Sequence, residues 1–481
     1  WGEFTNRIMR AATFLAKLGL KKGDRFAIIS TNSYRQAELI YGGYWGGCIP
    51  VPVNFRLAAK EISLILEDCE ANFLFIEENF IDLLKDQELT SFSSKHSVLP
   101  SAAHRQQYDT ALLSYPPAPP QKIDENDLAI LIYTGGTTGK SKGVKLTHRN
   151  IITNGMQLAV ALEIKPNDIY LHVAPMFHSA DFIGTGFSML GAAHSYLSAP
   201  TPQSVLATLS ETKATVLMLP PALIIGMLQE PNINQYDLSN LRCIIYGSAP
   251  MAAEWIKKTL EAFPKADLIQ GFGLTETSPI LTTLGNSEHR AALQGKSEQF
   301  FKSAGLPVIG LDLKIVDNVG NEVKQGTSGE VAVRGGNVTK GYLNLPDLTT
   351  QTIRQGWFHT GDIGKLDEQG YLYLLDRKKD IIISGGENIY SSEVEAVLYQ
   401  HPDVYEAAVV GVPDEKFGEA VFAIISPKPG TSISEDEIID HCRSRIGGYK
   451  IPRKMAFVEA LPKSAVGKIL KTELRKTYAG S

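Results

Sequence analysis

Short runs of apolar residues alternate with helical patterns through the first half of the chain, and this alternation constrains the fold more than any other feature. The clearest runs are residues 25–30, 72–77, 127–134, 214–220 and 241–247. They are rich in Ile, Leu and Val, and several are followed by Gly, Pro or a helical pattern. Strands that are buried on both faces have such continuous apolar runs. The pattern therefore predicts an α/β fold with largely buried parallel strands.

Two other parts of the chain depart from this alternation. Residues 305–376 contain short strand patterns separated by turns, as in LDLKIVDNVGNEV and GYLYLLD, and they predict an antiparallel β subdomain. Residues 91–127 are rich in Ser and Pro and show weak periodicity, so we interpret them as a surface connection. No internal repeat is evident in the sequence.

After Asp380 the pattern predicts a small α+β unit. Two helical stretches begin with a serine that has a glutamate three residues later, at Ser392 and Glu395 and again at Ser434 and Glu437. This spacing is typical of a capping box, in which the two side chains bond the first N–H groups of the helix. Three apolar runs in the same region predict strands.

Length and charge limit the class of protein. A chain of 481 residues is too long for one ordinary core, and we expect about two to four domains or subdomains. The apolar fraction of 43% and the charged fraction of 21% are ordinary for a globular protein. A net charge of −5 gives no reason to expect nucleic acid or a strongly anionic membrane as a partner. The sequence indicates neither peripheral membrane contact nor an oligomeric state.

Cysteine usage and the N-terminus bear on location. No apolar run approaches the length of about 18 residues that a transmembrane helix needs. The chain begins at Trp1 rather than Met, so we expect a trimmed N-terminus; residues 1–20 predict an amphipathic helix and show no signal-peptide pattern. The cysteines lie far apart, without disulfide or metal-ligand spacing, and are expected to be reduced core residues of a cytoplasmic protein: Cys48, Cys69, Cys243 and Cys442.

Residues 133–144, YTGGTTGKSKGV, nearly match a Walker A phosphate loop. Gly139, Lys140 and Ser141 fit its end, but the position five residues before Gly139 is Thr134 instead of Gly. Glycine-rich backbone can expose N–H groups to an anion because no Cβ blocks the approach. Hydroxyl and ammonium groups add donors and charge, which favours polyphosphate binding over a Gly/Thr turn with solvated lysines: Thr134, Thr137, Thr138, Lys140 and Lys142.

Four more stretches follow this loop in order, and together the five resemble the adenylate-forming superfamily of AMP-binding enzymes. This superfamily includes acyl-CoA synthetases, peptide-synthetase adenylation domains and luciferases. The resemblance covers essentially the whole chain. Gly135 stands where the family has Ser, and Ser141 where it has Pro; the first change removes a hydroxyl donor and keeps the backbone N–H, so we expect slower turnover at most. The other stretches are QGFGLTE (270–276), GWFHTGD (356–362), DRKKDIIISGGENIY (376–390) and PKSAVGK (462–468).

The resemblance implies a fold and a two-step reaction. Residues 1–379 are expected to form a large N-terminal domain of αβ subdomains plus the antiparallel β subdomain, and 380–481 a small mobile α+β domain, with a hinge near Lys379. ATP, with Mg²⁺, converts a carboxylic acid to acyl-AMP and pyrophosphate, and the thiol of CoA then takes the acyl group. Both steps develop oxyanion charge, so catalysis is expected to depend on positioning and cationic stabilisation.

The resemblance also gives roles to single residues. Lys468 reaches the α-phosphate and the acid's carboxylate during adenylation; the alternative is a surface lysine in a basic tail. Thr275 donates to the α-phosphate and Glu276 holds Mg²⁺. For both, a helix N-terminus with acidic first-turn residues explains the local sequence equally well. His178 lies near the acid's carboxylate in the family, and a structural histidine is the alternative.

Asp362 and Arg377 correspond to the residues that contact the ribose in the family; a β-turn aspartate and a solvated charge run are the alternatives. The remaining expected contacts to ATP and CoA come from small, glycine-rich stretches. They are the phosphate loop (Thr134, Gly135, Gly136, Thr137, Thr138, Gly139, Lys140, Lys142), the adenine stretch (Tyr246, Gly247, Ser248, Ala249), Gly271, Phe272 and Gly273, and, beside the pantetheine of CoA, Gly385 and Gly386.

The sequence thus predicts an AMP-forming acyl-CoA synthetase whose partners are a small carboxylic acid, ATP and CoA. Residues 179–191 are mostly small or apolar and favour a hydrophobic acid, with medium- to long-chain fatty acids expected. Asp181 faces either the acyl pocket or solvent. Benzoate- or coumarate-like aryl acids, or another adenylate-forming reaction, remain alternatives. A P-loop NTPase is disfavoured by the Walker spacing, and a binding protein without activity by the retained Lys468 and Glu276.

Overall fold

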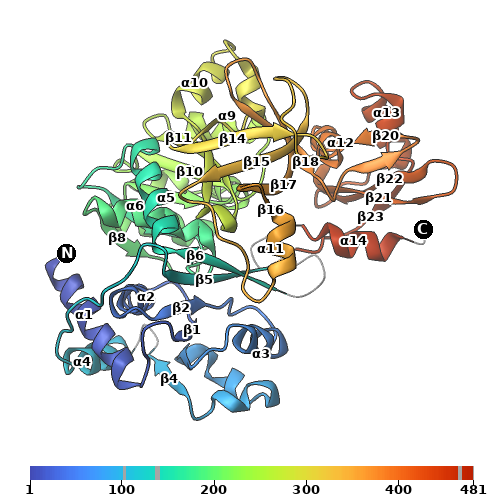
Figure 1. The fold of residues 1–481 in the computed structure, drawn as a ribbon. Helices are drawn as coiled ribbons and strands as arrows, with labels where there is room; N and C mark the ends of the chain where they lie inside the picture. The colour runs from blue at the N-terminus through green and yellow to red at the C-terminus, as the bar shows by residue number, and fades with distance from the viewer. Residues whose placement is uncertain (101–103, 136–140, 464–468, 480–481) are drawn as a thin grey trace.

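The computed structural model describes residues 1–100, 104–135, 141–463 and 469–479. Its first unit is a four-stranded parallel sheet in the order β2-β1-β3-β4, which lies at the bottom of Figure 1. The strands are β1 (Arg25–Ile29), β2 (Ile49–Pro52), β3 (Phe73–Glu77) and β4 (His96–Leu99). The helices are α1 (Gly2–Lys17), α2 (Tyr34–Gly46), α3 (Ala59–Asp68), α4 (Arg105–Leu113) and the 3-10 segments η1 (Glu78–Lys85) and η2 (Gln87–Phe92).

The helices of this unit follow from their apolar faces and ends. The helix α1 buries Ile8, Ala11, Ala12 and Leu15, which lie on one helical face, as the amphipathic pattern predicts. Gly47 ends α2 with a φ of +73°, a left-handed conformation that glycine adopts without steric cost.

Residues 91–100 and 104–127 contain more regular structure than the sequence indicates, and the expectation of a plain surface connection is wrong for the part that holds β4 and α4. They contain the edge strand β4 and the helix α4, and Leu99 and Leu112 are 2% and 1% exposed. An edge strand of four residues and a helix of nine are too short to produce a clear period.

The second unit is a seven-stranded sheet in the order β13-β12-β11-β10-β9-β7-β8. The pairs among β8, β7, β9, β10 and β11 are parallel, whereas β12 and β13 are antiparallel to their neighbours. The strands are β7 (Ile169–His172), β8 (Ala193–Tyr196), β9 (Val216–Leu219), β10 (Cys243–Gly247), β11 (Asp267–Gly273), β12 (Ile280–Leu284) and β13 (Leu306–Pro307). The helices are α5 (His148–Ala161), α6 (Gly184–Met189), α7 (Pro202–Thr212), α8 (Pro221–Leu228), α9 (Ala253–Ala262), α10 (Asn286–Leu293), η4 (Ser179–Ile183), η5 (Ile233–Gln235), η6 (Thr275–Thr277) and η7 (Glu298–Lys302).

One of the expected parallel strands has a different partner. The strand β5 (Leu128–Thr134) pairs antiparallel with β6 (Lys142–Thr147) in a separate two-stranded sheet. Its side chains from Ala129 to Ile132 are at most 1% exposed. A strand buried on both faces has the same apolar run whichever way its neighbour points, so the sequence pattern could not reveal the direction.

The third unit is the antiparallel β subdomain, as expected. Its sheet runs β14-β15-β17-β16, and β18 pairs with β17. The elements are β14 (Leu311–Val316), β15 (Gly329–Gly335), β16 (Ile353–Arg354), β17 (Trp357–Leu366), β18 (Leu372–Arg377) and α11 (Pro346–Thr352).

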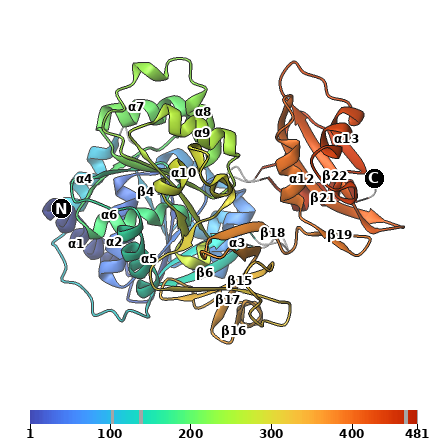
Figure 2. The same ribbon diagram turned by 90° about the horizontal axis from the view of Figure 1, so that it is seen from above.

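The C-terminal elements form a sheet of their own and lie to one side of the preceding units (Figures 1 and 2). Buried clusters cover both faces of this sheet, one packed with α12 and α13 and the other with α14. The strands are β19 (Ile382–Ser384), β20 (Glu387–Ile389), β21 (Val404–Asp414), β22 (Gly418–Pro427) and β23 (Lys454–Phe457). The helices are α12 (Ser391–Leu398), α13 (Glu435–Arg443), α14 (Lys471–Tyr478) and η8 (Gly448–Lys450).

The two expected capping boxes have different outcomes. Ser434 and Glu437 form theirs: Ser434 Oγ accepts from Glu437 N at 3.3 Å, and Glu437 Oε2 accepts from Ser434 N at 2.8 Å. The box at Ser392 is wrong, because α12 already begins at Ser391. Glu395 instead forms an ion pair with Lys471 at 2.7 Å.

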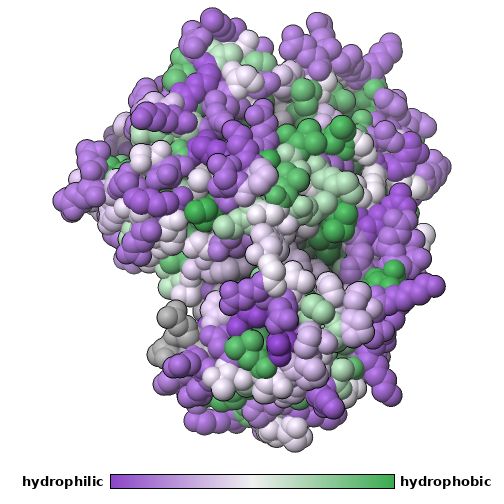
Figure 3. All heavy atoms as spheres, turned by 90° about the vertical axis from the view of Figure 1, so that its left-hand side faces the viewer, coloured by the Kyte–Doolittle hydropathy of each residue, from purple (hydrophilic) through white to green (hydrophobic). Residues whose placement is uncertain are grey.

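The surface of the described residues is mainly polar, with some exposed apolar side chains. None of the helices among the described residues is long and apolar enough to cross a membrane. The face in Figure 3 is mostly hydrophilic, with its largest group of hydrophobic side chains to the right of the centre and smaller ones elsewhere. On α5, Ile152, Met156 and Val160 are 41%, 52% and 63% exposed at helical spacing.

Candidate active site

The phosphate-loop candidate connects the two strands of a β-hairpin. Thr134 at the end of β5 is the Cα partner of Lys142 at the start of β6. A Walker A loop instead runs from a strand into a helix, so the structure separates the two kinds of loop. A Cβ built on Gly135 meets nothing within 4 Å, so this position is open. The predicted residues that lie outside the described ranges are Gly136, Thr137, Thr138, Gly139, Lys140 and Lys468.

Glu276 and Lys142 lie beside one tyrosine. Tyr342 donates its phenol to Glu276 Oε1 over 2.8 Å, and Lys142 Nζ is 5.4 Å from the centroid of the Tyr342 ring. Burial and the Glu276 carboxylate raise the pKa of Tyr342, so the phenol keeps its proton and stays a donor. Thr339 N donates to the carbonyl of Glu276 at 2.8 Å. Hydrogen bonds thus hold Glu276 through both its backbone carbonyl and its side-chain carboxylate.

The donor set around Glu276 fits Mg²⁺ held mainly by phosphate oxygens. Among the described residues there is no group of three or more His, Cys, Asp or Glu side chains arranged to hold a metal. A dedicated protein cage is therefore not present in those ranges. Mg²⁺ commonly binds one or two carboxylates and takes its other ligands from water and phosphate.

Thr275 and His178 come together through Ser179. The hydroxyl groups of Ser179 and Thr275 hydrogen-bond at 3.0 Å, and these two residues are 2% and 7% exposed. His178 Nδ1 accepts from Ala180 N at 3.2 Å and caps the start of η4. A ring nitrogen that accepts carries no proton, so this bond assigns the proton of a neutral His178 to Nε2. The acyl-side candidate and the phosphate-side candidate are therefore neighbours.

Asp362 and Arg377 are cross-strand partners on β17 and β18. Arg377 Nε lies 2.7 Å from Asp362 Oδ1. Asp362 is 6% exposed, whereas the side chain of Arg377 is one-third exposed. The pair is preformed, and its guanidinium has an open side toward solvent, which suits a contact with a polar ligand.

Glycines bring the ends of β10 and β11 into close contact. Gly247 and Gly271 are Cα partners, and a Cβ on Gly247 would lie 2.3 Å from Gly271 O. A Cβ on Gly273 would lie 1.8 Å from Pro279 O. Ser248, at a φ of +67°, follows this edge and is exposed, as is Ala249. Ligands of α/β sheets commonly bind at the carboxyl ends of parallel strands, and these residues lie there.

The side chains of Tyr246 and Phe272, in these same stretches, pack against core clusters. Tyr246 is 1% exposed, and its hydroxyl lies 2.8 Å from His289 Nε2, so its side chain belongs to the core rather than to the open strand edge. Phe272 is only half-buried and packs against another core cluster. The expectation that Tyr246 lines the adenine does not match its burial.

Gly385 and Gly386 form the turn of the β19–β20 hairpin, with φ values of +60° and +86°. Two successive positive φ angles are the geometry that hairpin turns require, and glycine meets it without strain. This turn belongs to the C-terminal unit, whereas Thr275, Glu276 and Asp362 belong to the preceding units. The predicted site residues therefore fall into two separate groups.

Sequence reasoning missed Ser179 and Tyr342. Ser179 directly follows His178, so its position was available, but its partner Thr275 is 96 residues away. Tyr342 lies 66 residues from Glu276, in a GYLN stretch without any recognisable motif.

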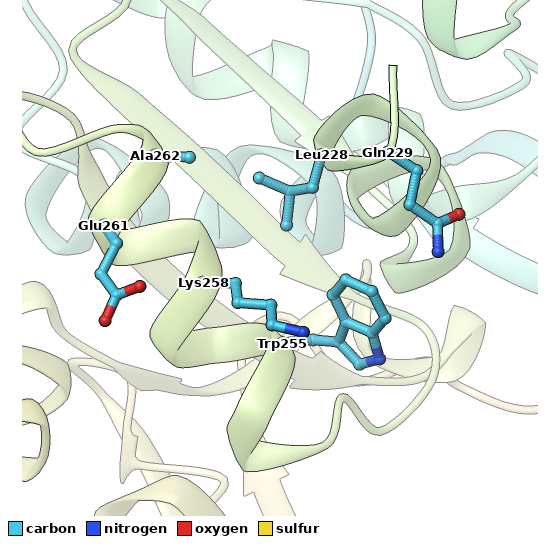
Figure 4. Close-up of a pocket in the computed structure, with 6 residues that line it drawn as sticks. All are labelled: Leu228, Gln229, Trp255, Lys258, Glu261 and Ala262. Atoms are coloured by element: carbon cyan, nitrogen blue, oxygen red, sulfur yellow. The ribbon is translucent and has the colours of Figure 1, made fainter. Parts of the chain in front are cut away.

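The groove in Figure 4 is not part of this site. It lies between α8 and α9 and is lined by Leu228, Gln229, Trp255, Lys258, Glu261 and Ala262. Lys258 Nζ lies 4.5 Å from the centroid of the Trp255 ring. None of the residues predicted to bind ATP, CoA or the acid lines the groove.

Comparisons with known proteins agree with this arrangement. Residues 1–343 match the family model of AMP-binding enzymes, and residues 393–468 match that of the AMP-binding enzyme C-terminal domain. The chain is 33% identical over 480 residues to a feruloyl-CoA synthase of Amycolatopsis sp, covering 99% of this chain and 94% of that protein. It is 34% identical over 485 residues to the long-chain-fatty-acid–CoA ligase FadD13 of Mycobacterium tuberculosis, covering 98% and 92%.

Solved structures show the same fold. The ATP-bound crystal structure of MatB from Rhodopseudomonas palustris superposes with a TM-score of 0.89 at 29% identity, covering 100% of this chain and 93% of that one. The family models cover most of the chain, and the relatives match it almost from end to end. The chain therefore belongs to the AMP-binding enzymes of the adenylate-forming superfamily and is, by class, an AMP-forming acid–CoA ligase.

Proposed function

We propose that the enzyme activates a hydrophobic carboxylic acid with ATP and transfers the acyl group to CoA at the site around η4, η6 and the β5–β6 hairpin. The observation that carries this proposal is the hydrogen bond of 3.0 Å between Ser179 and Thr275. It joins the segment of His178, assigned to the acid, to the segment of Thr275 and Glu276, assigned to the phosphates. Adenylation needs these two ligands side by side.

In the first half-reaction a carboxylate oxygen of the acid attacks the α-phosphorus of ATP, and the bond to pyrophosphate breaks. Thr275 and Lys468 stabilise the negative charge on the transferring phosphoryl group. Glu276 would hold Mg²⁺, which supplies charge neutralisation on the phosphate oxygens when bound. Asp362 and Arg377 orient the ribose. In the second half-reaction the CoA sulfur attacks the acyl carbonyl and AMP leaves.

The acid is proposed to be a medium- to long-chain aliphatic acid. Residues next to His178 are apolar and almost completely buried, and Ala180, Phe182 and Ile183 are 5%, 8% and 1% exposed. Asp181 does not face solvent, because it is only 7% exposed, so the second of the two expectations is wrong. Its carboxylate is buried against His172, at 2.6 Å from Nδ1. The one carboxylate in this segment is thereby hydrogen-bonded to a protein partner, which leaves it less available to a second polar group of the acid.

An aryl acid is the second candidate, and it is favoured by the similarity to a feruloyl-CoA synthase. A panel of acids separates the two: acetate, octanoate, palmitate, benzoate, cinnamate and ferulate, each scored for CoA-dependent formation of AMP. We expect octanoate and palmitate to give the highest kcat/KM. Preference for an aryl acid would establish the second candidate. Orthophosphate in place of pyrophosphate as the product, or no activity with any acid, would reject the proposed reaction.

The cytoplasm is the proposed location. All four cysteines are buried and free, which is usual for proteins of a reducing compartment. Fractionation of the source cells with an antibody to the chain tests this, and enrichment in an oxidising compartment would reject it.

A further inference from the structure

The segment from His172 to Asp181 is a loop whose two ends are joined by their side chains. His172, the last residue of β7, donates from Nδ1 to Asp181 Oδ1 over 2.6 Å across nine positions of sequence. Both side chains are buried, with 6% and 9% exposed. His178 and Ser179 lie inside this closed loop, just before Asp181. The acyl-side candidates are therefore carried on a loop that is tied at its base.

A second tie holds the first part of the loop. Asn32, which follows the strand β1, donates from Nδ2 to the carbonyl of His172 at 3.2 Å and to that of Ala174 at 2.9 Å. Its side-chain oxygen accepts from Met176 N at 2.8 Å. One buried side chain thus fixes alternate residues from 172 to 176, and the segment enters the turn at His178 in a defined direction.

The far end of the loop contacts the phosphate side. Ser179 Oγ bonds Thr275 Oγ1 at 3.0 Å, and Asp181 N donates to the carbonyl of His178 at 3.0 Å. A movement of Asp181 therefore moves His178 and Ser179 with it. The loop has three ties, at its base, along its first half and at its tip.

A hydrogen-bonded chain lies behind His172. His172 Nε2 is 2.8 Å from His194 Nδ1, His194 Nε2 is 3.1 Å from Ser188 Oγ, and Ser188 Oγ is 2.9 Å from Tyr41 OH. Burial, and then the neighbouring His172, lower the pKa of His194 to about 3, so this ring is neutral. One consistent assignment has every donor pointing along the chain from Tyr41 toward Asp181. The chain then fixes which nitrogen of His172 carries the proton.

Packing leaves the His172 ring little freedom. A Cβ built on Gly184 would lie 2.7 Å from His172 Cε1, so the backbone at the start of α6 lies directly against the ring. On another side, the ring stacks on Tyr196 with centroids 4.5 Å apart and planes at 14°. Only glycine at 184 admits the ring in this position. The contact between His172 and Asp181 is therefore held by its surroundings as well as by its own hydrogen bond.

We propose that His172 and Asp181 are positioning residues for the acid. They close the loop so that His178 and Ser179 stay at a fixed distance from Thr275, where the acid's carboxylate must meet the α-phosphate. This inference rests on the proposed function of that site. Apolar side chains of similar volume can fill a buried space without the desolvation cost of buried polar groups, so a hydrogen-bonded polar pair in this place indicates a requirement for geometry.

The test compares substitutions at the two ends of the hydrogen-bonded series that runs from Tyr41 to Asp181. Asp181→Asn keeps the volume and weakens the tie, whereas Tyr41→Phe removes a hydroxyl at the other end and leaves the loop closed. In acid-dependent ATP–pyrophosphate exchange with octanoate and with cinnamate, we expect Asp181→Asn to raise KM for the acid about tenfold and to change KM for ATP less than about twofold. Tyr41→Phe should leave both constants within about twofold. Equal changes in both constants for Asp181→Asn would overturn the proposal.

A double-mutant cycle asks whether Asp181 acts through His178. If it does, the effect of Asp181→Asn disappears in a His178→Ala background, because the positioned group is already gone. Additive effects of the two substitutions would show that Asp181 acts elsewhere and would overturn the proposal. If Asp181→Asn does not fold, Ser179→Ala opens the tie at the tip of the loop. It is expected to give the same selective rise in KM for the acid, and its absence would also overturn the proposal.

A measurement without catalysis separates this inference from the proposed function. Backbone hydrogen exchange, followed by mass spectrometry, should speed up in residues 173–181 of Asp181→Asn and remain unchanged there in Tyr41→Phe. Unchanged exchange in Asp181→Asn rejects the loop closure even if the enzyme is active. Conversely, a wild-type chain that activates no acid rejects the proposed function and leaves the exchange result to judge the loop.

Discussion

The groups at the proposed adenylation site and the groups at the junction with the C-terminal unit are held in different ways. At the site, hydrogen bonds connect segments that lie far apart in sequence, such as Ser179 with Thr275 and Tyr342 with Glu276. At the junction, one carboxylate collects several donors: Asp376 Oδ2 accepts from Ser391 N at 2.5 Å and from Ser391 Oγ at 2.7 Å. The first arrangement stays intact only if the second and third units keep their relative positions, whereas the second is lost when a single contact opens.

The contact at the junction caps the N-terminus of α12. The N-cap residue of this helix, Tyr390, makes no capping bond with its side chain, so Asp376 supplies the acceptor from β18. Asp376 precedes the proposed hinge at Lys379, and Ser391 follows it. A rotation of the C-terminal unit about Lys379 would therefore separate the cap from its helix. If the proposed site and hinge are correct, positions are fixed where the acid and phosphates would meet and are exchangeable where the C-terminal unit would turn.

The largest expected effect concerns Lys468, which lies outside the described residues. Lys468→Ala should lower acyl-AMP formation by about 10²- to 10³-fold, because a cation directed at the developing charge is removed. Conversion of supplied acyl-AMP to thioester should remain near the wild-type rate, since the lysine is not needed there. Pyrophosphate exchange and thioester formation, measured separately, check both statements. Adenylation at a near wild-type rate would remove Lys468 from the site.

The second prediction addresses the hinge. Lys379→Pro fixes φ near about −65° and should prevent the rotation, so thioester formation falls by about two orders of magnitude while adenylation persists. Lys379→Ala is the control, because it removes the same ammonium group and leaves the backbone free. A stopped-flow series on both half-reactions makes the comparison. Parallel loss of both in the proline variant would show that residues 376–380 form an ordinary charged turn.

The third prediction addresses the fixed region. Tyr342→Phe removes the donor to Glu276, and the Mg²⁺ concentration needed for half-maximal adenylation should rise about tenfold. Tyr373→Phe is a matched control, since Tyr373 lies in the same subdomain but donates to Asp367, at 3.1 Å, and not to Glu276. A magnesium titration of pyrophosphate exchange is the measurement. Equal curves for the two variants would separate Glu276 from the metal.

The smallest expected effect is at the cap of α12. Asp376→Ala should destabilise the present orientation of the C-terminal unit by about 1 kcal/mol. The equilibrium between this orientation and rotated ones should then shift about fivefold toward the rotated forms. Adenylation should then slow several-fold relative to thioester formation. Ser434→Ala removes a cap of similar strength on α13, inside the C-terminal unit, and should lower its unfolding temperature without changing that ratio. The same ratio in both variants would mean that Asp376 only stabilises the helix.

Much of the architecture could be predicted from local patterns. The parallel strands β1, β3, β9 and β10 match the apolar runs, and the antiparallel subdomain matches its short strands and turns. The direction of β5 could not be predicted, because burial on both faces produces one pattern for either direction. The capping box at Ser392 was predicted wrongly because its true cap is not local in sequence. Its cap comes from Asp376, sixteen positions earlier, and no short spacing rule contains that residue.

For the candidate site too, local motifs identified some residues, whereas the partners that hold them depend on tertiary packing. Motifs located Thr275, Glu276, Asp362 and Arg377. The last two are a cross-strand pair because the β17–β18 hairpin places them opposite each other, although its register shifts between Ile363 and Gly364. The partners that fix the site could not be found locally. Asp181 meets His172 only because β7 ends and η4 begins at the two ends of one closed loop. Such pairs depend on tertiary packing, which a single sequence does not display.

The glycines at the ends of β10 and β11 limit how this enzyme can change over generations. Substitution of Gly247 or Gly273 by any other residue would bring a Cβ to 2.3 Å or 1.8 Å from a backbone oxygen, and backbone cannot move aside as a flexible side chain can. Lineages that shift to a different acid therefore have almost no viable mutations along this edge. In the proposed acyl stretch, residues 179–191, Ser179, Asp181 and Gly184 are held by Thr275 and His172, so the accessible routes lie in the other side chains of that stretch. Libraries made to alter substrate preference should accordingly be concentrated there.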